Sequence, residues 1–301
     1  MRKLRTGTIP QSLREMHEQT GAGLAARAVS VGRQTTDRPL NLRVHRFYGM
    51  PGSEMKNAFI TGTSSGLGRA LAVRLREPGW QVYGCSRRGC DLVGVHDRRL
   101  DLTDYASVPA ALDELLAGVT SIDLVVLNAG VLGEIRDLSE TPLDRVKQVM
   151  ETNVWANKVL MDWLHASRIA VAQIVMISSG AAVLGNRGWG AYALSKSALN
   201  MLARLYAHEF PNTHICALAP GIIDTAMMDY LCNEADAASY PALQRLRDAR
   251  GTPTMPNADA AAERILSVLD DLRRFPSGSF VDIREILDPD EYARLYRGGA
   301  G

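Results

Sequence analysis

The chain has 301 residues, of which 46% are hydrophobic and 22% are charged, and its formal net charge is +1. This composition is ordinary for a globular protein and excludes global disorder. The near-neutral charge argues against a nucleic-acid-binding domain, which would be strongly basic, so we expect no nucleic-acid partner. Uncharged apolar runs stay shorter than the roughly 18 residues of a transmembrane helix, so we expect no membrane association.

Residues 1–54 differ in composition from the rest of the chain. They hold nine Lys or Arg residues against four Asp or Glu residues, and their apolar residues follow no clear period. A poorly ordered extension fits this pattern. Three interpretations stay open: a basic tail without a role, a targeting peptide, or upstream sequence outside the native protein. Glu15 and Glu18 disfavour a transit peptide, and a start at Met55 would lead straight into a strand. We expect residues 55–301 to form a single NADP-binding catalytic domain.

From Met55 onward, predicted strands and helices alternate. Apolar runs predict strands at 58–61, 81–86, 122–128, 171–178, 214–219 and 279–283, with one more before Asp101. Helical periodicity is found at 68–76, 105–117, 142–167, 190–209 and 258–272. In the helix over 142–167, Pro142 stands near the first position and Thr141 is expected to be the cap. Continuous apolar strands between helices indicate a parallel sheet covered on both faces. The prediction is a doubly wound (Rossmann) α/β domain of about seven strands in three layers, α/β/α.

A glycine-rich turn follows the first predicted strand. It reads TGTSSGLG over residues 61–68, with the glycine spacing G-x3-G-x-G. Glycine is needed where a tight turn brings the backbone close to a pyrophosphate, and the helix that follows supplies free N–H groups. A purely structural turn is the alternative. The residues expected to bind a cofactor here are Gly62, Ser64, Ser65, Gly66, Leu67 and Gly68.

The residues after the second predicted strand select the cofactor. A carboxylate there would bind the ribose 2′-hydroxyl of NAD, whereas an arginine accommodates the 2′-phosphate of NADP. The chain has Ser86, Arg87 and Arg88 at this place. Guanidinium groups suit a doubly charged phosphate, so we expect Arg87, assisted by Arg88 or Ser86, to select NADP(H). Two solvated arginines on a loop are the alternative.

Two further strand ends carry candidate cofactor contacts, because open α/β sheets bind ligands at the carboxyl ends of their strands. Asp101 and Leu102 follow the third strand and are expected near the adenine. Asn128, Ala129 and Gly130 end the fourth strand. Asn128 also has a structural interpretation, since an asparagine there can tie neighbouring strands together.

The most specific signal is the combination of Ser179, Tyr192 and Lys196. Tyr192 and Lys196 are four residues apart on a predicted helix and therefore share one face. A phenol with a pKa near 10 is a poor acid at neutral pH, and a nearby ammonium would lower that pKa. Ser179 follows the fifth strand, where its hydroxyl could hold a substrate carbonyl oxygen beside the phenol. This arrangement predicts general acid catalysis on a carbonyl group.

These motifs resemble the short-chain dehydrogenase/reductase family over about residues 56–283. The resemblance rests on TGTSSGLG, on NAG at 128–130, on TNVWANK around Asn153, and on ISSG, YALSK and PGIIDT. It implies that Tyr192 is the general acid, that Lys196 binds the nicotinamide ribose and modulates Tyr192, and that Ser179 orients the carbonyl. It also implies a water relay held by Asn153. Contacts with the nicotinamide carboxamide are implied for the loop that contains Pro220, Ile223 and Thr225.

A narrower resemblance points to sepiapterin reductases and bacterial benzil reductases. It rests on the runs 188–192, 219–227 and 277–282. In sepiapterin reductases the Asp of the last run anchors the pterin, so the resemblance implies Asp282 as a substrate anchor, with a capping or surface carboxylate as the alternative. Trp189 is expected to wall the substrate pocket by stacking, and plain packing is equally open.

We therefore expect an NADPH-dependent carbonyl reductase acting on a ketone, an α-dicarbonyl or a pterin side-chain carbonyl. One alternative is a secondary-alcohol dehydrogenase working in the oxidative direction. The other is a regulator that senses NADP without turnover, which the intact Ser179, Tyr192 and Lys196 disfavour. Residues 226–256 are Met-rich and are expected to form a substrate lid.

The remaining expectations concern metals, compartment and assembly. The six histidines are dispersed without metal-ligand spacing, so no metal is expected. The four cysteines form no CxxC pair, which indicates free thiols in a reducing, cytoplasmic setting. The helix at 190–209 is apolar nearly all round, which predicts burial against a sister subunit in a homodimer or homotetramer.

Overall fold

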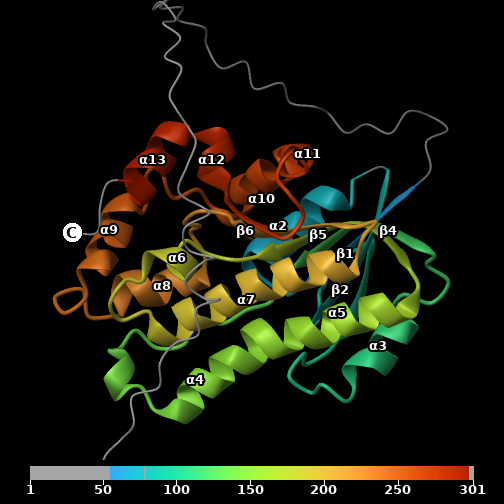
Figure 1. Cartoon of the computed structure of the whole chain (residues 1–301), viewed down its shortest axis with the longest axis horizontal. Coiled ribbons are helices and arrows are strands. Elements are labelled where there is room, and N and C mark those ends of the chain that lie inside the picture. The colour runs from blue at the N-terminus through green and yellow to red at the C-terminus, as the bar shows by residue number, and fades with distance from the viewer. Residues whose placement is uncertain (1–54, 78, 298–301) are drawn as a thin grey trace, which may run out of the picture. The chain divides into compact units, whose positions relative to one another are not determined.

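A computed structural model describes residues 55–77 and 79–297; the interpretations of residues 1–54 lie outside this range. Within it, seven parallel strands form one sheet in the order β3-β2-β1-β4-β5-β6-β7 (Figure 1). The strands are β1 (Lys56–Thr61), β2 (Trp80–Ser86), β3 (Val95–Arg99), β4 (Ser121–Leu127), β5 (Ala170–Ile177), β6 (His214–Ala219) and β7 (Ser279–Asp282). The predicted doubly wound sheet is confirmed.

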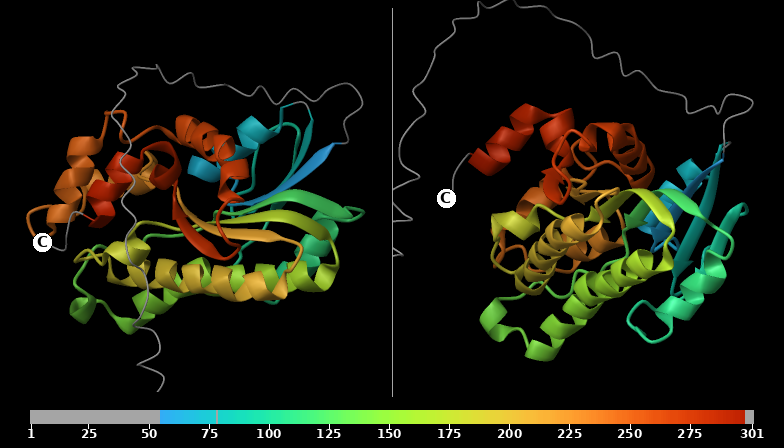
Figure 2. Two further views of the ribbon diagram at one scale, coloured as in Figure 1. Left: turned by 45° about the horizontal axis from the view of Figure 1, so that its top comes forward. Right: turned by 45° about the vertical axis from the view of Figure 1, so that its right-hand side comes forward.

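Helices cover both faces of the sheet (Figures 1 and 2). One face is covered by α3 (Val108–Leu115), α5 (Ala156–Ser167) and α7 (Gly190–Glu209), and the other by α2 (Gly66–Leu75), α10 (Ala258–Ser267) and α11 (Leu269–Leu272). Strand β1 shows why the central part of a strand is apolar on both of its faces. Phe59 points into the first layer, whereas Ala58 and Ile60 point into the second, and all three are fully buried.

The predicted helix over 142–167 is found as three consecutive pieces. They are α4 (Leu143–Met150), a π-helical turn η2 (Glu151–Trp155) and α5. The cap prediction was wrong: Pro142, with ψ of 138°, takes the N-cap position. Thr141 instead uses its hydroxyl to donate to the carbonyl of Asp137 at 2.9 Å.

The shorter elements surround the carboxyl ends of the strands. They are η1 (Leu138–Glu140), α6 (Ala181–Leu184), α8 (Ala226–Asn233), α9 (Pro241–Ala249), α12 (Ile283–Leu287) and α13 (Pro289–Arg297). None of the helices in the described part of the chain is both long and apolar enough to cross a membrane.

Candidate active site

The chain reverses its strand order between β1 and β4, and the glycine-rich turn lies at this point. The Asn128 side chain donates from Nδ2 to the carbonyl of Thr61 at 2.9 Å. The backbone N–H groups of Asn128 and Ala129 both donate to the Thr61 hydroxyl at 3.0 Å. Asn128 therefore ties β4 to β1, as its structural interpretation anticipated. These bonds join the two strand ends at the point where the strand order reverses, the place at which open α/β sheets bind dinucleotides in a crevice.

The glycines of this turn are required by close backbone approach. A Cβ on Gly68 would lie 2.4 Å from the carbonyl oxygen of Gly62, a distance that no side chain tolerates. Gly62 has a φ of +82°, in the left-handed region that favours glycine. The start of α2 is thereby pressed against the end of β1, which leaves its first N–H groups facing the crevice.

Arg88, rather than Arg87, reaches the glycine-rich turn. Its Nη2 lies 2.8 Å from the Ser65 hydroxyl and 3.4 Å from the Ser64 hydroxyl. Arg87 is exposed, and its positive charge helps to hold the pKa of Asp101 below its usual range, behind the larger effect of the Thr103 hydrogen bonds. Ser86 is buried, and its hydroxyl has no hydrogen-bond partner within the described residues.

A hollow of about 750 Å³ opens beside Arg88. It is lined by Ser64, Arg69, Arg88, Gly89, Cys90, Asp91, Val95, Asp97 and Arg99. Arg69 pairs with Asp91. Asp97 accepts hydrogen bonds from the Thr63 hydroxyl at 2.9 Å and from the Cys90 N–H at 2.8 Å. The guanidinium groups of Arg88 and Arg99 therefore provide the positive charge of the hollow.

The side chains of Asp101 and Leu102, the predicted adenine contacts, are already engaged within the protein. The Asp101 carboxylate accepts from the Thr103 N–H at 3.0 Å and from its hydroxyl at 2.7 Å, which makes it part of a local turn. The Leu102 side chain is buried in the core with Leu100 and Val108. Only the backbone of Leu102 is therefore available to a cofactor.

Ser179, Tyr192 and Lys196 converge at the carboxyl end of β5. The Lys196 ammonium donates to the carbonyl of Ile177 at 2.7 Å and lies 5.6 Å from the centre of the Tyr192 ring. Its side chain is almost completely buried. One N–H of the ammonium is thus occupied, and two are left for a ligand.

Burial controls the ionisation of this group of residues. It raises the pKa of Tyr192 to about 12, a rise opposed by the hydrogen bond with the Ser179 hydroxyl. It also lowers the pKa of Lys196 to about 8. The expected lowering of the phenol pKa by Lys196 is not found in this structure, in which burial dominates the shift of the Tyr192 pKa. The protonated phenol is the form that a general acid needs.

Asn153 lies in the π-helical turn η2 and connects two parts of the site. Its Oδ1 accepts from the Val131 N–H at 2.8 Å, and its Nδ2 donates to the Val131 carbonyl at 2.8 Å and to the Ser195 hydroxyl at 2.9 Å. Ser195 in turn donates to the carbonyl of Tyr192 at 2.7 Å. Both Nδ2 hydrogens are used, which leaves one lone pair of Oδ1 for the expected water relay. Sequence reasoning missed Ser195, although its place between Tyr192 and Lys196 was a signal.

The loop after β6 approaches the glycine-rich turn. A Cβ on Gly66 would lie 3.7 Å from Cγ2 of Thr225, so this loop and the first helix face the same crevice. Ile223 packs on the core, and Pro220 stands before Gly221, whose φ is +81°. The predicted nicotinamide loop and the predicted pyrophosphate turn are thus neighbours.

The predicted lid, residues 226–256, packs over the tyrosine. Its helices α8 and α9 bury an apolar cluster made of Leu132, Met228, Leu231, Cys232, Ala235, Leu243 and Met255. The rings of Trp189 and Tyr192 pack against this cluster, with their centres 6.3 Å apart. Tyr230 and Tyr240 fasten the lid by accepting hydrogen bonds from the N–H groups of Ile135, at 3.3 Å, and Asp137, at 3.1 Å.

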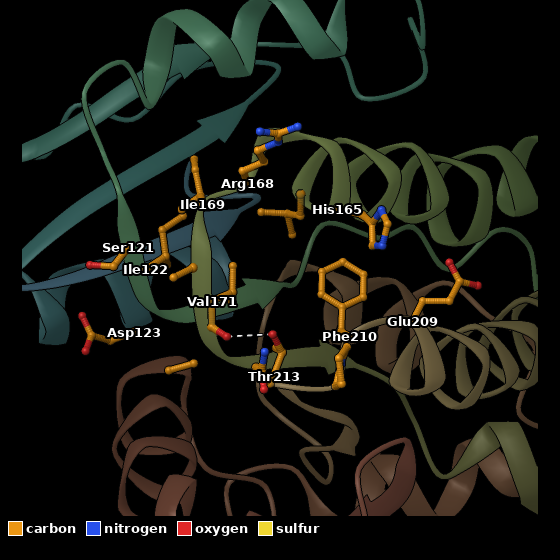
Figure 3. A pocket seen from close by; sticks show the side chains of 15 residues that line it. Ser121, Ile122, Asp123, His165, Arg168, Ile169, Val171, Glu209, Phe210 and Thr213 are labelled. Atoms are coloured by element: carbon orange, nitrogen blue, oxygen red, sulfur yellow. Dashed lines mark hydrogen bonds between the residues drawn. The ribbon is translucent and has the colours of Figure 1, made fainter.

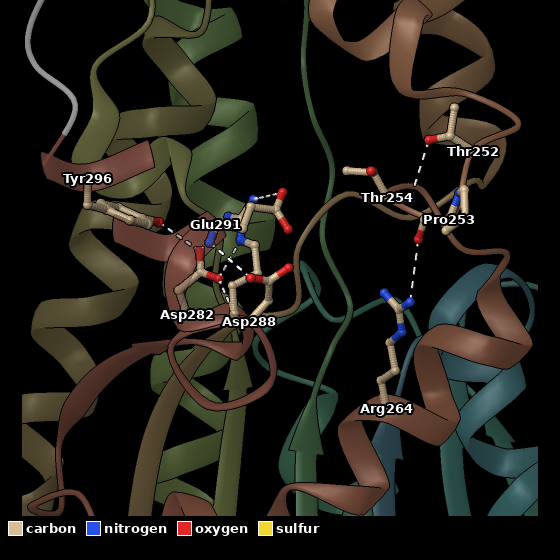
Figure 4. A network of polar contacts seen from close by, with 9 residues as sticks. Thr252, Pro253, Thr254, Arg264, Asp282, Asp288, Glu291 and Tyr296 are labelled. Carbon is tan, nitrogen blue, oxygen red and sulfur yellow. Dashed lines mark hydrogen bonds and ion pairs between the residues drawn. The ribbon is translucent and has the colours of Figure 1, made fainter. Parts of the chain in front are cut away.

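Asp282 departs from the expectation of a substrate anchor. Its carboxylate is fully buried, caps α12, and accepts from Nε and Nη2 of Arg284 at 2.8 and 2.6 Å and from the Tyr296 hydroxyl at 2.7 Å (Figure 4). The network lies close to Ser179, since a Cβ on Gly180 would be 3.0 Å from the Tyr296 oxygen. Both oxygens are occupied, so the carboxylate supports the C-terminal helices in this conformation. Sequence reasoning did not anticipate Arg284 or Tyr296.

A second hollow, of about 430 Å³, lies at the amino ends of the central strands, opposite the end that carries the glycine-rich turn. It is lined by residues at the starts of β4, β5 and β6 and at the ends of α5 and α7, among them His165, Arg168, Glu209 and Phe210 (Figure 3). None of the predicted site residues lines it.

In the described part of the chain, no group of three or more His, Cys, Asp and Glu residues is placed to hold a metal ion.

Comparison with known proteins agrees with this geometry. A family model described as short chain dehydrogenase matches residues 56–236. Benzil reductase ((S)-benzoin forming) of Bacillus subtilis (strain 168) is 28% identical over 247 residues, covering 77% of this chain and 100% of that protein. Protein FixR of Bradyrhizobium diazoefficiens is 31% identical over 266 residues, covering 81% and 88%. The crystal structure of the KRED1-Pglu enzyme has the same fold, with a TM-score of 0.64, 24% identity and coverage of 75% and 100%.

Proposed function

Because the chain belongs to the short-chain dehydrogenase family, whose members are oxidoreductases acting on CH–OH and C=O groups, we propose that it is an NADPH-dependent carbonyl reductase. The observation that carries the proposal is the convergence of Ser179, Tyr192 and Lys196 at the carboxyl end of β5. Several relatives are named benzil reductase, which favours a ketone or an α-dicarbonyl as substrate.

In this proposal each residue has a defined task. When bound, NADPH supplies the hydride that reaches the carbonyl carbon. Ser179 holds the carbonyl oxygen, and Tyr192 donates its phenolic proton to that oxygen. The two free N–H groups of Lys196 bind the nicotinamide ribose and favour the phenolate as it forms. Acid catalysis of this kind typically contributes about 10²–10⁴-fold to the rate.

Asn153 acts through other residues. Its bonds to Val131 and Ser195 fasten the segment after β4 to the helix that carries Tyr192 and Lys196. In this way Asn153 fixes the distance between the nicotinamide side and the acid. A water relay through the remaining lone pair of its Oδ1 stays part of the proposal.

The remaining cofactor contacts follow from the crevice. We assign the pyrophosphate to the turn from Gly62 to Gly68, the adenosine side to Asp101 and the backbone of Leu102, and the nicotinamide side to Gly130, Ile223 and Thr225. Asn128 and Ala129 shape the crevice through their bonds to Thr61. The tight glycine contacts and the exposed helix start support a dinucleotide at this place.

The preference for NADPH over NADH is proposed to rest on Arg88, with Arg99 as a second cation. Two guanidinium groups beside the Ser64 and Ser65 hydroxyls suit a ribose 2′-phosphate. Arg88→Ala should weaken NADPH binding by about tenfold, the lower part of what a charge-assisted hydrogen bond contributes, and leave NADH binding unchanged. Arg87→Ala is the matched control and should have a smaller effect. Titration of both nucleotides checks this; tighter binding of NADH than of NADPH by the unaltered protein would contradict it.

The reaction is tested by following NADPH oxidation with diketones, ketones, quinones and pterins. We expect turnover with at least one aromatic diketone. Tyr192→Phe should abolish turnover while NADPH still binds, because the change removes a proton donor and leaves the crevice intact. Full turnover by that variant would overturn the mechanism.

Compartment and assembly complete the proposal. All four cysteines are free, which suits a reducing compartment such as the cytoplasm. Helix α7 leaves Leu194, Met201 and Leu205 about half exposed on its outer side. An apolar stripe of this kind supports a homodimer or homotetramer formed through α7.

A further inference from the structure

The Ser179 hydroxyl is oriented by a local turn centred on Gly180. Its oxygen accepts from the Ala181 N–H at 3.1 Å, and the Ser179 carbonyl accepts from the Ala182 N–H at 3.0 Å. A serine hydroxyl that bonds the backbone two residues further on forms such a turn, and the bond fixes the direction of its oxygen. Because the same hydroxyl bonds to Tyr192, a shift of the Gly180 backbone would move the oxygen that lies beside the acid.

Helix α7 holds this turn from one side. The Ser178 hydroxyl donates to Oδ1 of Asn200 at 2.5 Å, and the Ser197 hydroxyl donates to the Ala182 carbonyl at 2.5 Å. Both partners belong to α7, which also carries Tyr192 and Lys196. These two bonds therefore tie the ends of the turn to the helix of the acid and leave Gly180 between them.

The C-terminal segment holds the same turn from another side. A Cβ on Gly180 would lie 3.0 Å from the Tyr296 oxygen and 3.8 Å from Nη2 of Arg284, so both side chains lie against the Gly180 backbone. Their common partner Asp282 ends β7, which is two strands away from β5, the strand that leads to Ser179. At about 4.8 Å between neighbouring strands, this separation is about 10 Å. Arg284 and Tyr296 therefore connect the end of β7 to the turn after β5.

One carboxylate fixes both of these side chains. Tyr296 donates to Oδ2 of Asp282 at 2.7 Å, and Arg284 donates to both carboxylate oxygens (Figure 4). The Asp282 side chain is fully buried and that of Arg284 is 18% exposed. Nη1 of Arg284 also lies 3.9 Å from Oε1 of Glu291 on α13. Charge-assisted bonds that are shielded from water hold their groups in one geometry, so the network is a firm support for whatever it touches.

We propose that Tyr296 and Arg284 are positioning residues for the reaction. Together with Asp282 they hold the Gly180 turn in place and so keep the Ser179 hydroxyl beside Tyr192. The inference rests on the proposed reductase function. It gives the C-terminal helix α13 a task in the reaction, because Tyr296 lies on that helix and acts only through Ser179.

Tyr296→Phe tests the proposal in the full-length protein, because it keeps the ring and removes the hydroxyl that contacts Asp282 and Gly180. The single-turnover rate of NADPH oxidation, at saturating nucleotide and with the fastest carbonyl substrate of the panel above, measures hydride transfer without product release. We expect this rate to fall about threefold to tenfold, since a small displacement of a group that orients the substrate slows the reaction. The dissociation constant of NADPH should stay the same. An unchanged rate would overturn the proposal.

A double-mutant cycle with Ser179→Ala separates positioning from general damage to the fold. If Tyr296 acts through the Ser179 hydroxyl, adding Tyr296→Phe to Ser179→Ala should change the single-turnover rate by less than about twofold. A damaged fold would instead lower the rate by the same factor in both backgrounds. Equal losses with and without the Ser179 hydroxyl would therefore refute the proposal.

Tyr206→Phe is the matched control, because the Tyr206 hydroxyl also donates to a carboxylate, that of Asp162 on α5. Each variant loses a phenol–carboxylate hydrogen bond, so each should lower Tm by about 2–4 °C. Tyr206→Phe should keep the single-turnover rate, and a loss as large as that of Tyr296→Phe would overturn the proposal. If the unaltered protein oxidises neither NADPH nor NADH with any carbonyl of the panel, the reductase function fails and this inference fails with it. If it turns over and only the effect of Tyr296→Phe is missing, this inference alone fails.

Discussion

Replacing Lys196 by methionine should stabilise the nucleotide-free protein at neutral pH. The ammonium is almost completely buried, and burial lowers its pKa from 10.5 to about 8. Below pH 8 the folded protein holds a desolvated charge, which the unfolded chain keeps in water. At about 1.36 kcal/mol per pKa unit, this difference corresponds to about 3 kcal/mol. The lost hydrogen bond to Ile177 offsets about 1 kcal/mol of it. We therefore expect a net gain of about 2 kcal/mol at pH 7.

The sign of the pH dependence follows from the same shift. Between pH 8 and pH 10.5 the unfolded chain binds a proton at Lys196 that the folded protein has released, so the stability of the unaltered protein rises with pH. The advantage of Lys196→Met should therefore shrink through this window and vanish near about pH 10, where the remaining charge effect equals the lost hydrogen bond. Urea unfolding of both proteins without nucleotide, at pH 7 and pH 10, measures the difference. An equal difference at the two pH values would refute the reasoning.

Three further changes test other parts of the structure. Asp282→Asn should lower the free energy of unfolding by about 3 kcal/mol, because it leaves Arg284 partly buried without its carboxylate; unchanged urea unfolding would contradict this. Gly68→Ala should cost about 2 kcal/mol and weaken NADPH binding, since its Cβ would collide with the Gly62 carbonyl; nucleotide titration and thermal unfolding measure both effects, and normal binding would argue against a tight turn. Leu205→Arg should reduce the mass seen in sedimentation velocity, because it places a charge on the exposed apolar stripe of α7; an unchanged mass would place the subunit contact elsewhere.

The sheet and the glycine-rich turn could be predicted because local sequence determines them. Runs such as residues 58–61 and 171–178 are mostly apolar and do not alternate between polar and apolar residues, which favours a strand buried on both faces. The spacing of Tyr192 and Lys196 on one helix depends on helical geometry alone, so it also survived the comparison with the structure. These features need no knowledge of which distant segments meet.

Other features depended on tertiary contacts and could not be predicted. Which of two neighbouring arginines reaches the turn is set by the bend after β2, where Gly89 has a φ of +79° and turns the chain back toward Ser86. The occupation of Asp282 depends on Tyr296, which comes from the last helix. The ammonium of Lys196 was expected to act on the phenol, but the nearest acceptor is the Ile177 carbonyl at the end of β5.

The π-helical turn Glu151–Trp155 amounts to one extra residue inserted into an otherwise continuous helix. Each residue of a helix turns the chain by about 100°, so the insertion puts α4 and α5 out of rotational phase. Removing one residue from this turn would restore a regular helix, yet it would swing the Asn153 amide away from Val131 while α5 kept its buried face. The length of the turn between α4 and α5 therefore matters as much as which residues occupy it. A one-residue deletion here should be more damaging than most substitutions.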